Sequence, residues 1–332
     1  MLEKKLVSII IPTHNVGDYI GATIDCLLRQ TYSDIEIIVV DYESSDETAR
    51  IAYSYEDEAS ENHDSRVLYI PTKEAGVSTG RNLGLAEAHG SYVIFMDGDD
   101  LVEPDYVEYL MAQMTPDVAL ASCGYDMMAD GETLYASPES TTRVLSREDM
   151  LCRLFYLIND QGYVWNKIFR RDIIEEFQLR FQPDLYYGED RAFLVDYILH
   201  IERVRMAPKH LYHYQMRPDS AMDELRESRE DVTRMSPERL DRQATEVKAY
   251  LYMKKALRKY PDAKWLCSQV AVYTALQLYQ VIEESENPSI YRRCVFRKYI
   301  RKLRRVEYFG DEEDLMLQQY MNAYGRTGRV ML

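Results

Sequence analysis

An apolar segment that runs directly into three carboxylates is the feature that most constrains this chain. Residues 93–96 are apolar, and Asp97, Asp99 and Asp100 follow within four positions. The apolar segment is typical of a buried strand in a parallel sheet, and like charges this close stay together only beside water or a cation. The segment therefore predicts a metal site at the carboxyl edge of such a sheet, where ligands bind in open α/β folds. The alternative is an acidic turn ahead of the helix that Pro104 can begin.

Strand and helix patterns alternate through about residue 122. Apolar, β-branched runs predict strands at 7–11, 35–41, 67–70, 93–96 and 117–122. Helical periodicity is expected at about 17–30, after Ser45, through 81–86 and from Pro104. This alternation predicts an α/β layer with a mainly parallel sheet. Neither a dinucleotide-binding nor a P-loop glycine motif follows the first strand, so those two folds lose support.

The remainder of the chain has a different character. Residues 125–143 are polar and irregular, helical periodicity returns at 147–158, and the sequence beyond about residue 220 is charged and helical throughout. We therefore expect a second, helical region at the C-terminal end.

Composition excludes several functional classes. The net charge of −16 argues against a nucleic-acid partner, because such proteins bind phosphates through cationic side chains. The five cysteines are scattered and lack Cys-x-x-Cys spacing, which argues against a disulfide framework or a structural zinc site and favours a reducing compartment. The first apolar run is short and stops at Pro12, unlike a secretory signal, and no run is long enough to span a bilayer. We therefore expect a cytoplasmic protein.

Several of these segments together resemble a known family. Residues 7–15, 35–46, 76–100 and 188–193 resemble, in the same order, the motifs of the family 2 glycosyltransferases with the GT-A fold. The resemblance covers roughly residues 5–220 and rests on the order of several motifs, so it is more specific than any one of them.

The resemblance implies a fold and a division of the chain. The GT-A fold is an α/β fold with a Rossmann-like, mainly parallel sheet flanked by helices, and here it would carry a C-terminal helical extension. We expect the glycosyltransferase domain at 1–220, with a nucleotide-binding half at about 1–122 and an acceptor half at about 123–220. The helical region would cover 221–332.

The expected chemistry explains the acidic cluster. A nucleoside-diphosphate sugar loses its diphosphate as a leaving group, and a divalent cation such as Mn²⁺ or Mg²⁺, which prefers carboxylate oxygen, stabilises the charge that develops. By resemblance, Asp97, Asp99 and Asp100 form the Asp-x-Asp region. One of Asp99 and Asp100 would bind the metal, and a neighbour, Asp97 or Asp99, would contact the nucleotide sugar.

The resemblance also places residues around the nucleotide. The loop after the first strand would flank the base and ribose with Pro12, Thr13, His14 and Asn15. Arg81 is expected near the diphosphate, the alternative being a solvated helix charge. After the second strand the family usually has Asp/Asn-Asp-Gly-Ser, whereas this chain has Asp41, Tyr42, Glu43 and Ser44. Tyr42 thus replaces the acid that often binds uracil. It can stack on the base, donate a hydrogen bond or lie outside the site.

Gly188, Glu189 and Asp190 resemble the acidic pair that carries the catalytic base in inverting members. A single in-line displacement needs a carboxylate that takes the proton of the acceptor hydroxyl. We expect Asp190 to be this base and Glu189 to position it or bind the acceptor. The alternative is a pair of capping residues for the helix expected at 190–200.

Four further residues fall in segments that resemble acceptor or diphosphate contacts. Lys167 would meet phosphate, and Trp165 would face a sugar or be buried. His213 and Arg217, with Ser220, resemble a segment that closes over the diphosphate, although a lone histidine is more often structural.

Residues 292–305 form a basic, amphipathic stretch without any acidic residue. Such a helix suits peripheral contact with an anionic membrane and hence an acceptor carried on a polyprenyl lipid. The alternative is a solvated face that pairs with the acidic stretches at 283–286 and 311–314.

Together these features predict a metal-dependent, inverting glycosyltransferase of hexosyl or N-acetylhexosaminyl type, acting on a glycan or lipid-linked acceptor in surface polysaccharide or glycoconjugate synthesis. One rival is a sugar nucleotidyltransferase, which would need a glycine-rich basic loop in place of residues 12–15. The other is a non-catalytic nucleotide-sugar or glycan-binding module, which would have lost a carboxylate such as Asp99, Asp100 or Asp190.

Overall fold

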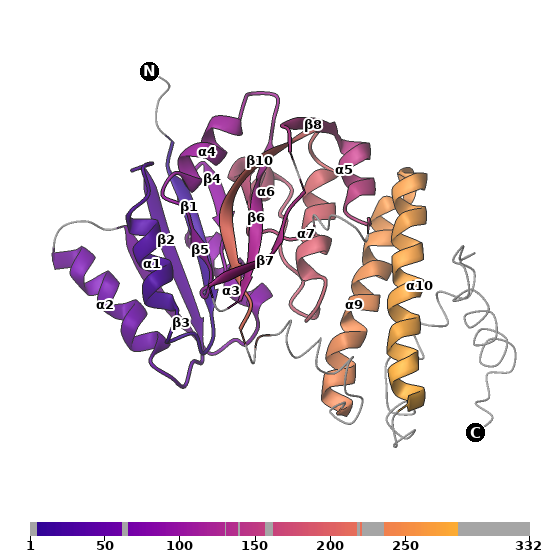
Figure 1. The fold of residues 1–332 in the computed structure, drawn as a ribbon, viewed down its shortest axis with the longest axis horizontal. Coiled ribbons are helices and arrows are strands. Elements are labelled where there is room, and N and C mark those ends of the chain that lie inside the picture. Colours follow the sequence, from indigo (N-terminus) through magenta and orange to yellow (C-terminus); the bar gives the residue numbers. More distant parts are fainter. Residues whose placement is uncertain are drawn as a thin grey trace, which may run out of the picture.

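A single mixed sheet forms the centre of the molecule (Figure 1). The structure is a computed structural model, and it describes residues 5–61, 66–129, 131–138, 140–156, 162–217, 220 and 236–284. The strands are β1 (Val7–Thr13), β2 (Ile35–Tyr42), β3 (Val67–Thr72), β4 (Tyr92–Phe95), β5 (Leu101–Val102), β6 (Leu120–Ala129), β7 (Glu132–Ala136), β8 (Arg143–Ser146), β9 (Lys167–Arg170) and β10 (Arg203–Gln215). The helices are α1 (Ile20–Leu28), α2 (Thr48–Glu61), α3 (Val77–Glu87), α4 (Tyr106–Gln113), α5 (Arg147–Arg153), α6 (Arg171–Glu176), α7 (Glu189–Ile198), α9 (Pro237–Ala256) and α10 (Pro261–Glu284).

The strand order is β3-β2-β1-β4-β9-β6-β10-β5, with β7 paired to β6 and β8 paired to β10. Strands β3, β2, β1, β4, β6 and β10 share one direction, whereas β9 is antiparallel to both of its neighbours. Because β9 is reversed, its first residue, Lys167, lies near the edge of the sheet at which β4 ends. The segment after β4 and the segment before β9 therefore meet at the same edge of the sheet.

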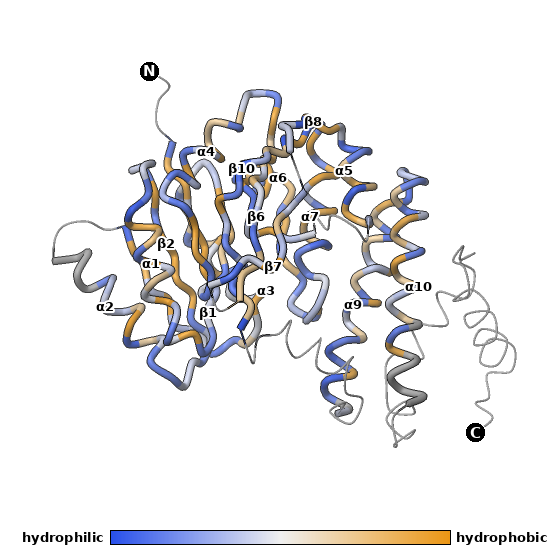
Figure 2. The backbone as a smooth tube through the Cα atoms, in the orientation of Figure 1, coloured by the Kyte–Doolittle hydropathy of each residue, from blue (hydrophilic) through white to orange (hydrophobic). Residues whose placement is uncertain are grey.

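Both faces of the sheet are covered by helices, as a mainly parallel sheet requires. Alternate residues of β1 show the division: Ile10 packs in one apolar core with Leu85 of α3, whereas Ile9 packs in a second core with Ile24 of α1. The first core also contains apolar residues of α5, α7, α9 and α10, and the second contains those of α4. Figure 2 shows largely hydrophobic colour along β1 and β2, as expected for strands that are covered on both faces.

Close packing of α3 on the sheet depends on Gly84. A Cβ atom at this position would lie 2.3 Å from Cγ2 of Ile10. Glycine therefore lets α3 approach β1 closely, which brings the start of α3 to the edge of the sheet at which β1 ends.

The long helices α9 and α10 stand side by side at one end of the sheet and pack on α7 and α5 (Figure 1). No helix in the described part of the chain is both long and apolar enough to cross a membrane. The basic stretch 292–305 lies outside the described residues. The division of the chain near residue 220 stays a prediction.

The observed elements confirm the predicted alternation through β6 and add strands that the sequence did not indicate. Residues 125–143, expected to be irregular, contain the end of β6, all of β7 and the start of β8. Every residue of β7 is exposed. A strand without a buried face does not need alternating apolar residues, which are the pattern that indicates a strand in a sequence.

Candidate active site at the carboxyl edge of the sheet

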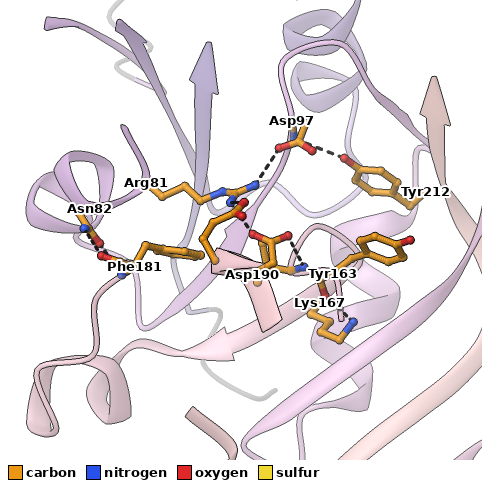
Figure 3. Close-up of polar contacts among 10 residues, drawn as sticks. Arg81, Asn82, Asp97, Tyr163, Lys167, Phe181, Asp190 and Tyr212 are labelled. Carbon is orange, nitrogen blue, oxygen red and sulfur yellow. Dashed lines mark hydrogen bonds and ion pairs between the residues drawn. The ribbon is translucent and has the colours of Figure 1, made fainter. Parts of the chain in front are cut away.

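Arg81 joins the acidic cluster after β4 to the acidic pair at the start of α7 (Figure 3). Its side chain is 3% exposed; Nη2 donates to Oδ1 of Asp97 at 3.1 Å, and Nη1 donates to Oε1 of Glu189 at 3.2 Å and to Oδ1 of Asp190 at 2.5 Å. The guanidinium also lies over the ring of Phe181, 5.1 Å from its centroid. Burial opposes the charge of Arg81, but the three carboxylates raise its pKa above the ordinary value. The alternative of a solvated helix charge is therefore wrong.

Two of the acids that contact Arg81, Glu189 and Asp97, have pKa values above those of free carboxyls. Burial, together with the charge of Asp190, raises the pKa of Glu189 to about 8, although Arg81 opposes the shift. Burial raises the pKa of Asp97 to about 6 against the same opposition from Arg81, and Asp99 adds to the increase. Glu189 can therefore carry a proton at pH 7 and act as a hydrogen-bond donor.

Asp190 is held on both carboxylate oxygens. Oδ1 accepts from Arg81, and Oδ2 accepts from the backbone N–H of Val164 at 3.3 Å. Its side chain is 16% exposed and thus remains accessible to a ligand. The N-cap of α7 is Gly188, with φ of 81°, and Glu189 and Asp190 follow it in the first turn.

Asp99 and Asp100 have different surroundings. Asp100 is completely buried; Oδ1 accepts from the backbone N–H of Gln215 at 2.8 Å and Oδ2 from the hydroxyl of Tyr212 at 2.5 Å. Burial, with the nearby charges of Asp99 and Asp97, raises the pKa of Asp100 well above its ordinary value. Asp99 is 17% exposed and pairs with Nε of Arg217 at 2.5 Å. Asp99 can therefore offer oxygen to a ligand, whereas Asp100 supports the loop from within.

The loops after β1 and β2 are tied together beside this cluster. The rings of His14 and Tyr42 stack with centroids 4.9 Å apart and planes 6° from parallel, and Nδ1 of His14 lies 2.7 Å from the carbonyl oxygen of Tyr42. Asn15 bonds to both Ser44 and Ser45 across the two loops. Burial raises the pKa of Tyr42 to about 12, and its hydroxyl also interacts with the charges of Arg81 and Asp97. Tyr42 thus faces the charged site.

Three residues beside the stacked pair of His14 and Tyr42 support the two loops. Pro12 and Thr13 are buried at the end of β1. Asp41 is also buried, and it accepts from the hydroxyls of Ser44 at 2.5 Å and Tyr69 at 3.1 Å. These contacts hold the base of the two loops.

The structure corrects two of the expected contacts. Lys167 is fully buried, and its ammonium donates to the carbonyl of Tyr163 at 2.6 Å and to Oδ1 of Asn166 at 2.7 Å, so it does not face a diphosphate. Trp165 is 2% exposed and is stacked on Tyr163 and Tyr212, which favours the buried alternative over a sugar contact.

His213 does not join the acidic cluster in this structure. Its Nε2 lies 2.9 Å from Oε1 of Glu103, and its Nδ1 lies 3.6 Å from Oδ2 of Asp126. Side chains alternate along a strand, so His213 points away from the face on which Tyr212 reaches Asp100. Arg217, by contrast, does lie in the cluster through its contact with Asp99.

Tyr212 is a site residue whose role the sequence did not indicate. Its hydroxyl donates to Asp100 and accepts from the backbone N–H of Asp97 at 3.4 Å. The aromatic spacing in residues 211–217 was the only available signal, and it did not show which tyrosine faces inward.

The chain is similar to proteins of a known family. The model of glycosyl transferase family 2 matches residues 8–177. EpsJ of Bacillus subtilis (strain 168), named a glycosyltransferase, is 34% identical over 219 residues, which cover 65% of this chain and 62% of EpsJ. YibD of Escherichia coli (strain K12), also named a glycosyltransferase, is 31% identical over 222 residues, or 65% of this chain and 63% of YibD. The match thus spans less than two thirds of either relative.

Solved structures show the same fold at low sequence identity. TarS 1–349 of S. aureus, in complex with UDP-GlcNAc, superimposes with a TM-score of 0.62 at 17% identity, covering 97% of this chain and 92% of that one. The mannosyltransferase PcManGT of Pyrobaculum calidifontis, with GDP-Man and Mn²⁺, gives a TM-score of 0.56 at 14% identity, covering 98% and 89%. The sheet and its flanking helices thus form the expected GT-A fold, and the chain belongs to glycosyl transferase family 2.

Proposed function

We propose that this protein is a metal-dependent, inverting glycosyltransferase that moves a sugar from a nucleoside-diphosphate sugar to a hydroxyl acceptor in surface polysaccharide or glycoconjugate synthesis. The observation that carries the proposal is the position of Arg81, which contacts Asp97 on the donor side and Asp190 on the acceptor side. One buried cation thereby joins the two groups of residues that such a transfer requires.

The residues present fit a hard divalent cation. Asp99 and Asp97 are partly exposed carboxylates, and oxygen is the ligand that Mg²⁺ and Mn²⁺ prefer. No group of three or more potential ligand side chains converges among the described residues, so the diphosphate and water would complete the coordination, as is usual for Mg²⁺. We assign Asp99 as the protein ligand. When bound, the cation stabilises the charge of the departing diphosphate.

The proposed reaction is a single displacement. The acceptor oxygen bonds to C1 of the sugar while the bond from C1 to the diphosphate oxygen breaks and its electron pair leaves with the diphosphate. The acceptor proton passes to a carboxylate oxygen of Asp190. Because Glu189 can remain protonated, it can hydrogen-bond the acceptor without competing as the base. Attack from the face opposite the leaving group inverts the configuration at C1.

The stacked pair of His14 and Tyr42 is the proposed contact for the nucleotide base. His14 follows β1 and Tyr42 is the last residue of β2, so both lie at the carboxyl edge of the sheet, where nucleotides bind in open α/β folds. The solved neighbours bind UDP, UDP-GlcNAc or GDP-Man, so the fold accepts both uridine and guanosine nucleotides. Tyr42 stands where a uracil-binding acid is usual in the family, and its hydroxyl offers one hydrogen bond to a base.

The donor half of the proposal is tested by thermal shift with UDP and GDP, each with and without Mn²⁺. A ligand that binds only the folded state raises the melting temperature, and we expect one nucleotide to do so in the presence of Mn²⁺. If neither nucleotide shifts the melting temperature with Mn²⁺, the donor assignment is wrong.

The catalytic half is tested with Asp190→Asn and nucleotide-sugars as donors. We expect the variant to keep the nucleotide-dependent thermal shift but to release nucleoside diphosphate at least ~100-fold more slowly than the wild type, because loss of general-base catalysis costs about 10²–10⁴-fold. Equal rates for the two proteins would remove Asp190 from the mechanism. A binding module without catalysis would show the thermal shift in the wild type and no release at all.

A further inference from the structure

Helix α9 binds the backbone that immediately precedes the acidic pair. Oγ1 of Thr245 accepts from the backbone N–H groups of both Tyr186 and Tyr187, each at 3.0 Å, and donates to the carbonyl of Arg242 at 2.6 Å. The hydroxyl of Thr245 thus accepts from two consecutive backbone N–H groups, and its own bond to the carbonyl of Arg242 orients it on α9. Two bonds to neighbouring amides fix the direction of the chain more tightly than one bond does.

The next residue, Gly188, also packs on α9. It has φ of 81°, a left-handed conformation that glycine adopts without strain, and a Cβ atom at this position would lie 2.9 Å from Cβ of Ala249. The turn that starts α7 is therefore packed directly on α9. Glu189 and Asp190 follow in the first turn of α7, so their backbone positions depend on this contact.

Side-chain contacts on either side reinforce the same segment. Lys248 of α9 forms an ion pair with Asp184, and Tyr250 accepts from Nη1 of Arg191 at 2.5 Å. These contacts bracket the acidic pair in sequence, whereas Arg81 and Val164 bind only its carboxylate oxygens.

We propose that Thr245 is a positioning residue for Asp190, although it lies beyond residues 8–177, which the family model matches. The proposal rests on the proposed role of Asp190 as the base. Thr245 fixes the backbone ahead of Gly188, the left-handed turn starts α7, and α7 presents Asp190 to the acceptor. A displacement of the base by about 1 Å can lower the rate about 100-fold.

The test compares Thr245→Val, which keeps the shape but removes the hydroxyl, with Thr245→Ser, which keeps the hydroxyl. The matched control is Tyr252→Phe, which removes a different hydroxyl between α9 and α7, the one that donates to Oδ2 of Asp196 at 2.6 Å. For each variant, kcat and KM are measured for release of nucleoside diphosphate from the nucleotide-sugar. Amide hydrogen exchange at Tyr186 and Tyr187 is followed in parallel.

We expect Thr245→Val to lower kcat about 10- to 100-fold, with the KM for the donor unchanged and faster exchange at both amides. Thr245→Ser should restore kcat and protection, and Tyr252→Phe should leave both unchanged. An unchanged kcat in Thr245→Val, or an equal loss in Tyr252→Phe, would overturn the inference. So would unfolding of Thr245→Val together with Thr245→Ala, because Thr245 would then support the whole fold.

Failure of the proposed function has a different outcome. In that case Asp190→Asn would release nucleoside diphosphate as fast as the wild type, whatever the variants of Thr245 do. If Asp190→Asn is inactive and Thr245→Val is fully active, the base is correct and only the positioning role is wrong.

Discussion

Nη1 of Arg81 donates to Oδ1 of Asp190 at 2.5 Å, although the two residues are 109 positions apart in the chain. Arg81 comes from the helix that follows β3, and Asp190 comes from the start of α7. Through Arg81, the acidic cluster after β4 and the acidic pair of α7 interact electrostatically, so a substitution in one group should change the pKa values of the other.

Replacement of Arg81 should therefore be more damaging than loss of an ordinary ion pair. Arg81→Met leaves Asp97, Glu189 and Asp190 without their cation, and we expect a loss of about 3–5 kcal/mol in the free energy of unfolding. Arg81→Lys keeps the charge but not the planar fork, so it should recover part of the stability. Urea denaturation measures both. Equal stability of Arg81→Met and the wild type would contradict the role given to Arg81.

The raised pKa of Glu189 predicts a pH dependence of stability. Its pKa is about 8 in the folded protein and 4.5 for a free side chain, so between these values the folded state binds a proton that the unfolded state has released. The free energy of unfolding should consequently fall as the pH rises from about 5 to 8. Glu189→Gln cannot ionise, and its stability should fall less over this range. Parallel pH profiles of the two proteins would refute the shift.

Asp99 and Asp100 should differ when each is replaced by alanine. Asp100→Ala removes the acceptor of both the N–H of Gln215 and the O–H of Tyr212, which should lower the free energy of unfolding by about 1–3 kcal/mol. Asp99→Ala removes a partly exposed carboxylate and should instead abolish the Mn²⁺-dependent part of the nucleotide thermal shift. The assignment would be reversed if Asp100→Ala lost the Mn²⁺ response and kept its stability.

The backbone conformation of Glu43 predicts that one substitution at this position will stabilise the protein. It is exposed and has φ of 55°, in the left-handed region that favours glycine. Glu43→Gly should relieve the strain and raise the free energy of unfolding by up to about 1 kcal/mol, less the entropy that glycine gains in the unfolded chain. Asn15 has φ of 51° but bonds to Ser45 through its side chain, so Asn15→Gly should not stabilise. A loss of stability in Glu43→Gly would contradict the expected strain.

The sequence predicted those parts of the fold that depend on local composition. The apolar run before Asp97 indicated β4, and β-branched runs indicated β1 and β2, because a strand buried on both faces has a recognisable composition. Strand β10 was missed, since Pro208 interrupts it and its pairing with β6 shifts register between Met206 and His210.

The site was predictable as a set of residues but not as a set of contacts. The acidic cluster and the pair at Glu189 and Asp190 are visible as motifs. Which of Asp99 and Asp100 is buried depends on Tyr212, which lies 112 positions from Asp100. No local pattern records a contact of this range. The buried position of Lys167 was missed for a different reason: its partners Tyr163 and Asn166 are close in sequence, but its burial follows from the place of β9 between β4 and β6.

The reversed strand β9 also has a consequence for how the chain can be divided. Strand β9, at 167–170, pairs with β4 on one side and with β6 on the other. A fragment that ended near residue 122 would retain β1 to β4 but would leave β4 as an open, apolar edge. Such an edge is a template for pairing with other chains. Strands β1 to β4 are therefore not expected to form a separable unit, because the edge of β4 is covered only after the ribosome has synthesised β9.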